Sequence, residues 1–152
     1  MRQRKLTYLL AIFLCSCNED PGINLGNNYK LAYSAQEGDP IIVTDKGIRG
    51  DAPTQIIGGK VLNFAFDSTF IVVVQKDRDS IMPRYSNLSQ ADQAFFQSPL
   101  KQYWIIDKRA KLFFDTKTKK YSNVYGPYDK KEYEQMRTEL SVPLTLDLGV
   151  KD

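Results

Sequence analysis

Few side chains in this chain can carry out nucleophilic or acid–base chemistry. The sequence has 152 residues, no histidine and two cysteines, Cys15 and Cys17. Without histidine there is no Ser-His-Asp triad, no Cys-His dyad and no proton transfer through an imidazole. Cys17 is the most informative thiol, because it ends the run Leu14-Cys15-Ser16-Cys17 directly after a basic and then apolar N-terminus.

The first 16 residues have the three parts of a secretory signal. Arg2, Arg4 and Lys5 form a positive start, an apolar stretch covers residues 6–14, and the small residue Ser16 precedes Cys17. The apolar stretch is too short to span a bilayer, which needs about 20 residues. A short anchoring helix or a buried strand is the alternative, but the basic flank and the terminal position favour export.

The run from Leu14 to Cys17 resembles the bacterial lipobox. The resemblance implies a diacylglycerol thioether on Cys17, cleavage before this residue, loss of Cys15 with residues 1–16 and acylation of the new amine, commonly with palmitate. It implies a lipid-anchored protein of the cell envelope. Asn18 stands where an aspartate would resemble an inner-membrane retention signal, so we expect the outer membrane. Glu19-Asp20 loosely resembles an acidic surface-export signal, and a tether facing the periplasm is the alternative.

Cleavage changes the charge of the chain. The full sequence has 21 basic and 18 acidic residues, and residues 1–16 contain three of the basic residues and no acidic one. The mature chain therefore has 18 of each and no net charge, which argues against a nucleic-acid partner. Its single thiol carries lipid, so we expect no disulfide, no zinc site of the usual Cys/His type and no cofactor, and we expect that the protein is not an enzyme.

Several aspartates lie in or near predicted turns: Asp45, Asp51, Asp67, Asp77 and Asp79. Such carboxylates could bind calcium or act in glycoside chemistry. No Asp-x-Asp-x-Asp-Gly loop is present, so we favour the interpretation that they cap local backbone amides, and we expect no metal. Gly58-Gly59-Lys60 lacks the other residues of a phosphate loop and predicts a hairpin turn.

Aromatic residues are the remaining candidates for binding. Tyr103, Trp104, Tyr121, Tyr125 and Tyr128 could form a platform for a sugar or a peptide, although aromatics are also common in strands and cores. We favour the core for Trp104 and keep Tyr121, Tyr125 and Tyr128 as possible ligand contacts.

The mature chain is long enough for one domain. We predict a polar tether over residues 17–28 and a single domain over 29–152. Alternating or β-branched segments predict a mainly-β, α+β fold, an antiparallel meander or hairpin sheet of about seven or eight strands. The expected strands cover 29–34, 41–43, 55–57, 60–66, 69–75, 102–107, 112–114 and 121–125, where Gly126-Pro127 ends the last. The run 70–74 is apolar on both faces and predicts a strand covered on two sides.

Two helices and a last strand complete the prediction. An excursion over 77–101 contains a possible short helix near 89–97, in which Ser89 opens a capping box and Phe95 and Phe96 pack on the body. Asp129 and Glu132 predict a capping box for a C-terminal helix that ends before Pro143. In that helix Tyr133, Met136 and Leu140 form the apolar stripe, and Arg137 is on the wet side. Alternation of Leu144, Leu146 and Leu148 predicts an edge strand.

A second resemblance covers most of residues 23–146. Residues 24–31, 103–107 and 125–127, with the helix of Tyr133 and Leu140, resemble a family of small bacterial lipoproteins of unknown function. The resemblance implies no activity. We expect a lipid-anchored binding or structural module that contacts an envelope protein, a peptide or a glycan. An immunity or inhibitor-like lipoprotein against an envelope-active enzyme is the alternative, and a carboxylate-based hydrolase is less favoured.

Overall fold

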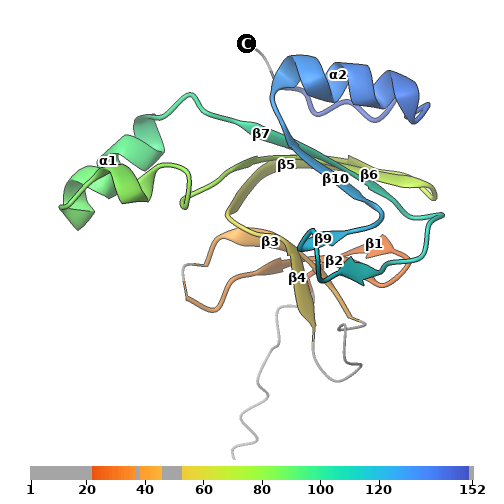
Figure 1. Cartoon of the computed structure of the whole chain (residues 1–152), viewed down its shortest axis with the longest axis horizontal. Helices are drawn as coiled ribbons and strands as arrows, with labels where there is room; N and C mark the ends of the chain where they lie inside the picture. The colour runs from red at the N-terminus through yellow and green to blue at the C-terminus, as the bar shows by residue number, and fades with distance from the viewer. Residues whose placement is uncertain (1–21, 37, 46–52, 151–152) are drawn as a thin grey trace, which may run out of the picture.

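The computed structural model describes residues 22–36, 38–45 and 53–150, and most of their strands lie in two facing antiparallel sheets (Figure 1). The first sheet has the order β1-β2-β3-β4 and comprises Ile23–Gly26, Tyr29–Tyr33, Pro40–Thr44 and Thr54–Ile57. The second has the order β10-β7-β6-β5 and comprises Val124–Tyr128, Gln102–Asp107, Phe70–Lys76 and Lys60–Phe66. The predicted mainly-β, α+β class is confirmed, although the strands form two facing sheets rather than one.

Strand β6 is the centre of the molecule. All its residues from Phe70 to Val74 are at most 2% exposed. Ile71 and Val73 pack into the cluster between the two sheets, whereas Phe70, Val72 and Val74 belong to a second cluster on the opposite face. Because side chains of a strand alternate between faces, a strand apolar at every position needs cover on both. The predicted burial on two sides is therefore confirmed.

Helix α2 (Lys130–Glu139) covers that opposite face of the second sheet (Figure 1). The carboxylate of Asp129 accepts a hydrogen bond from the Glu132 amide at 2.8 Å, and Glu132 accepts one from the Asp129 amide at 3.1 Å. This reciprocal pair confirms the predicted capping box. Tyr133 is buried in the cluster, and Met136 and Leu140 pack against it.

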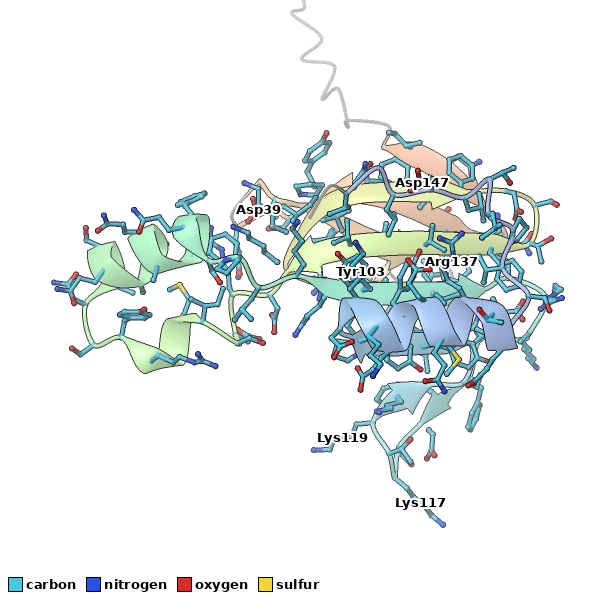
Figure 2. The ribbon with its side chains drawn as sticks, turned by 90° about the horizontal axis from the view of Figure 1, so that it is seen from above. Asp39, Tyr103, Lys117, Lys119, Arg137 and Asp147 are labelled. Atoms are coloured by element: carbon cyan, nitrogen blue, oxygen red, sulfur yellow. The ribbon has the colours of Figure 1, made fainter. Side chains whose placement is uncertain are left out.

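Arg137 was predicted to lie on the solvent-exposed side of α2. This prediction is wrong, because the residue is only 8% exposed. Its guanidinium donates to the Pro143 carbonyl at 2.8 Å, and the Val142 amide donates to the Arg137 carbonyl at 2.9 Å. The chain turns back at Ser141, which has a φ of +57°, and so covers the side of the helix that carries Arg137. Figure 2 shows Arg137 on the face of α2 that points toward the following segment.

The predicted edge strand at the C-terminus is wrong, because residues 144–148 pair with no strand in the described chain. Leu146 and Leu148 are buried in the cluster beneath α2, whereas Leu144 is 86% exposed. Asn63 of β5 donates to the Leu148 carbonyl at 2.6 Å. The alternation of leucines therefore reflects an extended segment that lies on the face of the second sheet.

Three connections differ from the prediction. Gly58-Gly59 is no hairpin turn: it joins β4 of the first sheet to β5 of the second. Residues 112–114 do not pair back on β7. A small separate hairpin, β8 (Phe114–Asp115) with β9 (Lys120–Tyr121), intervenes, and β10 takes the place beside β7. Strand β10 also continues through Gly126-Pro127 to Tyr128 instead of ending there.

The excursion over residues 77–101 forms an arm beside the sandwich (Figure 1). It contains a 3-10 turn, η1 (Met82–Arg84), and helix α1 (Leu88–Gln97). The N-cap is Asn87 rather than Ser89, because the Asn87 side chain accepts from the Ser89 amide at 2.9 Å. Phe95 is buried as expected, but Phe96 is 60% exposed.

The first strand lies inside the range predicted to be a tether. Strand β1 and its turn at Asn27-Asn28 occupy residues 23–28, inside the range assigned to the tether. Cys17 and the rest of residues 1–21 lie outside the described residues, as do Asp51 and most of the turn after β3. None of the helices in the described part of the chain is long and apolar enough to cross a membrane.

Candidate binding groove

A groove with a volume of about 640 Å³ opens at one end of the sandwich. Its walls come from the β1–β2 turn at Asn27-Asn28, the end of β3 at Thr44 and the loop over residues 108–113 that follows β7. Rings of Tyr29, Phe114 and Tyr121 complete it. This volume lies within the range of roughly 300–1,000 Å³ that small-molecule sites occupy.

The β1–β2 turn can reach the groove because two asparagines form it. Asn27 and Asn28 have φ angles of +50° and +67°, and a hairpin of two such residues suits asparagine, which tolerates left-handed backbone. The Asn27 side chain donates to the Lys108 carbonyl at 2.9 Å. This bond joins the first sheet to the loop after β7, so the two walls are fixed relative to each other.

Lys108 is buried beneath the groove, and its ammonium points into the sandwich. It donates to the Leu25 carbonyl at 2.7 Å and to the Asp67 carbonyl. Burial lowers the pKa of Lys108, and the Asp67 carboxylate partly opposes this effect. Since Leu25 lies in β1 of the first sheet and Asp67 in the turn that joins β5 and β6 of the second, this cation holds the two layers together at the groove end.

Arg109 is one of the residues that line the groove, and its guanidinium is held in a fixed orientation by Asp107. Its Nε donates to Asp107 Oδ1 at 2.9 Å and its Nη2 to Oδ2 at 2.7 Å, a bidentate pair. These hydrogen bonds hold the pKa of Asp107 below its usual value, although burial of the carboxyl opposes the shift. The guanidinium also lies 4.7 Å from the centre of the Phe70 ring. Phe70 belongs to the cluster beneath α2, so the guanidinium is paired with Asp107 over that face of the second sheet, and its side chain is 60% exposed.

The aromatic wall combines one buried and three more accessible rings. The Tyr29 hydroxyl accepts a hydrogen bond from the Asn123 amide at 2.9 Å, and burial raises the pKa of Tyr29. Phe114 and Tyr121 pack against each other across the β8–β9 hairpin, with ring centres 5.0 Å apart. Phe113 is 64% exposed. The groove therefore offers apolar ring surface.

The three tyrosines considered as ligand contacts do not meet at one site. Tyr121 lines the groove and packs against the cluster between the sheets. Tyr125 and Tyr128 of β10 pack against the cluster beneath α2, on the opposite face of the second sheet. Trp104 is partly buried against the inter-sheet cluster, in line with the favoured interpretation as core.

Sequence analysis missed Arg109, Lys111 and Phe113 as groove residues. Their signal is the basic segment Lys108-Arg109-Ala110-Lys111 followed by Leu112-Phe113, an aromatic-containing loop directly after a strong strand. Loops that follow rigid strands are frequent binding positions. This loop becomes a wall of the groove because the hairpin at Asn27-Asn28, far earlier in the chain, forms another wall and contacts it.

Two of the aspartates considered for chemistry cap turns. Asp67 accepts from the amides of Thr69 and Phe70 at 2.6 and 2.7 Å, and Asp77 accepts from the Asp79 amide and the Ser80 hydroxyl at 3.2 and 2.6 Å. Asp45 forms an ion pair with Lys30 at 2.9 Å. Within the described residues, acidic and cysteine side chains form no cluster of three that could hold a metal.

The structure thus defines a mainly-β sandwich domain with a helix over one sheet and a groove at one end. The chain belongs to the family of proteins of unknown function DUF3997, whose model matches residues 26–151. This match confirms the resemblance to a family of unknown function. No curated protein and no solved structure matches the chain.

Proposed function

We propose that the protein is a lipid-anchored binding module of the cell envelope, without catalytic activity, and that its ligand binds in the groove between the β1–β2 turn and the loop over 108–113. The observation that carries this proposal is a groove of about 640 Å³ lined by the exposed ring of Phe113, the Phe114–Tyr121 ring pair and the Asn27 side chain, which is fixed on the Lys108 carbonyl. Exposed aromatic surface next to preorganised polar groups on a rigid scaffold is typical of a binding site.

The position of the groove suits attachment through Cys17. Residues 18–22 separate the proposed lipid from β1 and can span at most about 18 Å. The chain enters the sandwich at Ile23 and reaches the groove at Asn27, at the opposite end of β1. A domain held close to a membrane would therefore present this groove away from its point of attachment.

Binding through the groove is tested with the full-length protein, tagged at its C-terminus and recovered from membranes in mild detergent. We expect Phe113→Ala to lose material that the wild type recovers from an envelope extract after cross-linking. Leu144→Ala is the matched control, because it removes another exposed apolar side chain outside the groove. Equal recovery by both variants and the wild type would contradict a role for the groove.

Attachment is tested by Cys17→Ser. We expect this variant to leave the membrane fraction or to accumulate with residues 1–16 uncleaved, and to incorporate no labelled palmitate. A Cys15→Ser variant should be processed and labelled like the wild type, since Cys15 leaves with the signal. Normal cleavage and membrane retention of Cys17→Ser would show that the lipoprotein assignment is wrong.

The arm over residues 77–101 favours a second candidate, an immunity or inhibitor-like lipoprotein that blocks an envelope-active enzyme. Tyr85, Leu88, Phe96 and Leu100 of this arm are 43–75% exposed, and a hollow of about 540 Å³ lies between η1 and α1. Projecting apolar side chains of this kind can enter the site of a partner enzyme. In that case Leu88→Asp should abolish inhibition of a hydrolase encoded beside this gene, and Phe113→Ala should not.

A further inference from the structure

The basic hairpin, residues 111–122 with β8 and β9 at its centre, carries positive charge that is not paired. It holds one of the 18 acidic residues of the chain, Asp115, and four of the 21 basic ones: Lys111, Lys117, Lys119 and Lys120. All four lysines are exposed, and none forms an ion pair with another described residue. Elsewhere a surface lysine such as Lys30 pairs with a carboxylate, that of Asp45, at 2.9 Å.

The carboxylate of Asp115 is bound to the turn of the hairpin rather than to a lysine ammonium. Its Oδ1 accepts a hydrogen bond from the Lys117 amide at 2.8 Å, and its Oδ2 accepts one from the Thr118 hydroxyl at 2.9 Å. These two bonds hold the pKa of Asp115 below its usual value. The four ammonium groups therefore repel one another on one small element, and an acidic partner would relieve this repulsion.

The hairpin is fixed to the sandwich before any partner binds. The rings of Phe114 and Tyr121 pack together, and Tyr121 also packs against the cluster between the sheets. The Ser122 amide donates to the Phe113 carbonyl at 2.8 Å, and the Ser122 hydroxyl donates to the Lys111 carbonyl at 2.9 Å. A charged element that is already ordered loses little conformational entropy when it binds.

The hairpin lies at the groove end of the molecule. Its rings form one wall of the groove, and Figure 2 shows Lys117 and Lys119 at its projecting tip. Under the proposed function, residues 18–22 join the lipid to Ile23, at the end of β1 opposite the groove. The membrane that holds the lipid would then lie on the other side of the domain, so the lysines would meet a partner other than that membrane.

The exposed ring of Phe113 favours a protein as this partner. Phe113 is 64% exposed, directly precedes β8 and lines the groove. Protein interfaces combine an apolar anchor at the centre with charged residues around it. An anionic polymer would need only the lysines and would bind without the ring.

We propose that the basic hairpin is a docking surface for a protein partner with an acidic patch. The carboxylates of the partner would meet Lys117, Lys119 and Lys120, and one of its apolar side chains would pack on Phe113. This inference rests on the proposed function, because Phe113 is part of the groove and the hairpin assigns a class of partner to it.

The inference is tested by fluorescence anisotropy of the full-length protein in non-ionic detergent with a labelled peptide that has glutamates on both sides of one phenylalanine. The comparison peptide has glutamine in place of each glutamate. An exposed ion pair raises affinity by at most about fivefold, so we expect several lysines together to favour the glutamate peptide by at least about tenfold. This preference should weaken as salt rises from about 50 to about 500 mM, a range over which the screening length falls to a few ångströms.

Variants separate the charge of the hairpin from the ring beside it. The double variant Lys117→Glu with Lys119→Glu should abolish the preference for the glutamate peptide and lose the cross-linked envelope material, while Phe113→Ala should weaken both peptides alike. Lys131→Glu is the matched control, since it makes the same charge change at an exposed lysine of α2. Its affinities should equal those of the wild type.

The possible failures are distinguishable. Absence of binding by the glutamate peptide, or equal binding of the two peptides, would overturn the acidic partner. Stronger binding of an oligogalacturonate, or of vesicles of phosphatidylcholine and phosphatidylglycerol, would overturn it in favour of an anionic polymer or a lipid surface. If the double lysine variant keeps the cross-linked envelope material and Phe113→Ala loses it, the inference is wrong and the proposed function stands; if Phe113→Ala also keeps it, both fail.

Discussion

Gly126 allows β10 to lie closely against β7. Its φ is +132°, and a Cβ atom at this position would lie 2.7 Å from Cε3 of Trp104 and 2.8 Å from the Tyr103 carbonyl oxygen. Real Cβ atoms do not approach other atoms this closely. A side chain here would therefore have to displace both the indole ring and the strand that carries it.

We expect Gly126→Ala to lower the free energy of unfolding by about 2–4 kcal/mol, because backbone strain and overpacking act together. Urea denaturation followed by tryptophan fluorescence measures this change. Gly38→Ala is the control: Gly38 also has a positive φ, +67°, but a Cβ atom added there would meet no atom within 4 Å. Its cost should be about 1 kcal/mol, and equal costs at the two sites would contradict the packing argument.

The hydroxyl of Tyr133 is buried beneath α2 and makes no hydrogen bond within the described residues. Its ring stacks on Tyr103 with centres 5.0 Å apart. Burial raises the pKa of Tyr133 to about 12, and the Arg137 charge only partly opposes this effect. Folding therefore holds this proton more tightly than the unfolded chain does.

Stability should consequently fall as pH rises from about 10, where the unfolded tyrosine ionises, to about 12, by up to about 2–3 kcal/mol from this group. Tyr133→Phe keeps the ring and should flatten that part of the slope. Urea midpoints at several pH values between about 8 and about 11 measure the difference. Parallel curves for Tyr133→Phe and the wild type would contradict the assignment.

At the scale of elements, the segment after α2 replaces a strand as cover for the second sheet. Leu146 and Leu148 are 6% and 4% exposed and share a cluster with Phe70, Val72 and Tyr133. Only side-chain packing and single contacts such as that from Asn63 fix this segment, since it has no ladder of backbone hydrogen bonds with the sheet.

Leu146→Ala should therefore lower the free energy of unfolding by about 2–5 kcal/mol, the usual cost of a cavity in a core. Leu144→Ala removes the same atoms two residues earlier, from a side chain that is 86% exposed, and should change stability by less than about 0.5 kcal/mol. Thermal or urea denaturation compares the two. Similar costs would mean that the tail does not pack as described.

The elements set by local pattern could be predicted from the sequence. β-Branched runs predicted β6 and β7, and Asp129 with Glu132 predicted the start of α2, because these signals act within a few residues. The passage of the chain from the first sheet to the second at Gly58-Gly59 could not be predicted. Two glycines permit a hairpin turn within one sheet and a connection between two sheets equally well. A bulge between Val61 and Asn63 then leaves Leu62 40% exposed, although its alternation with Phe64 and Phe66 suggested one shared face.

The groove could be predicted only in part, because it depends on contacts between residues that are far apart in the chain. Tyr121 was a candidate from its residue type, and it lines the groove. Arg109 and Phe113 become groove residues only because Asn27 contacts the Lys108 carbonyl, 81 positions away. Similarly, the burial of Arg137 depends on the reversal of the chain at Ser141, which no periodicity within the helix could indicate.

At the scale of the whole molecule, the arm and the sandwich differ in how they are held. Helix α1 packs mainly on η1 of the same arm, and only Ala91 and Phe95 of the helix are buried. Its contacts with the body are largely polar: Lys76 of β6 donates to the Phe96 carbonyl at 2.9 Å, and Arg78, which pairs with Asp92 of the helix at 3.0 Å, also pairs with Asp39 beside β3 at 3.5 Å. Helix α2 has the same length but packs on β7 and β10.

We therefore expect amide hydrogens of α1 to exchange faster than those of α2, because a helix with few buried contacts opens without global unfolding. Native-state hydrogen exchange with mass spectrometry measures both helices in one sample. Raising salt to about 0.5 M should speed exchange in α1 and leave α2 unchanged, since screening weakens the ion pair of Arg78. Equal protection in the two helices would show that the arm is an integral part of the folded core.

The sequence of strand β6 also affects how the chain behaves before it folds. Its run Phe70-Ile71-Val72-Val73-Val74 contains no charge, proline or glycine, and both its faces are sealed in the native sandwich. In an unfolded chain this run is a segment that can pair with copies of itself and aggregate. A chain that crosses a membrane before it folds would expose this run in transit, so prompt closure of the two sheets around β6 protects the protein from self-association as well as stabilising its fold.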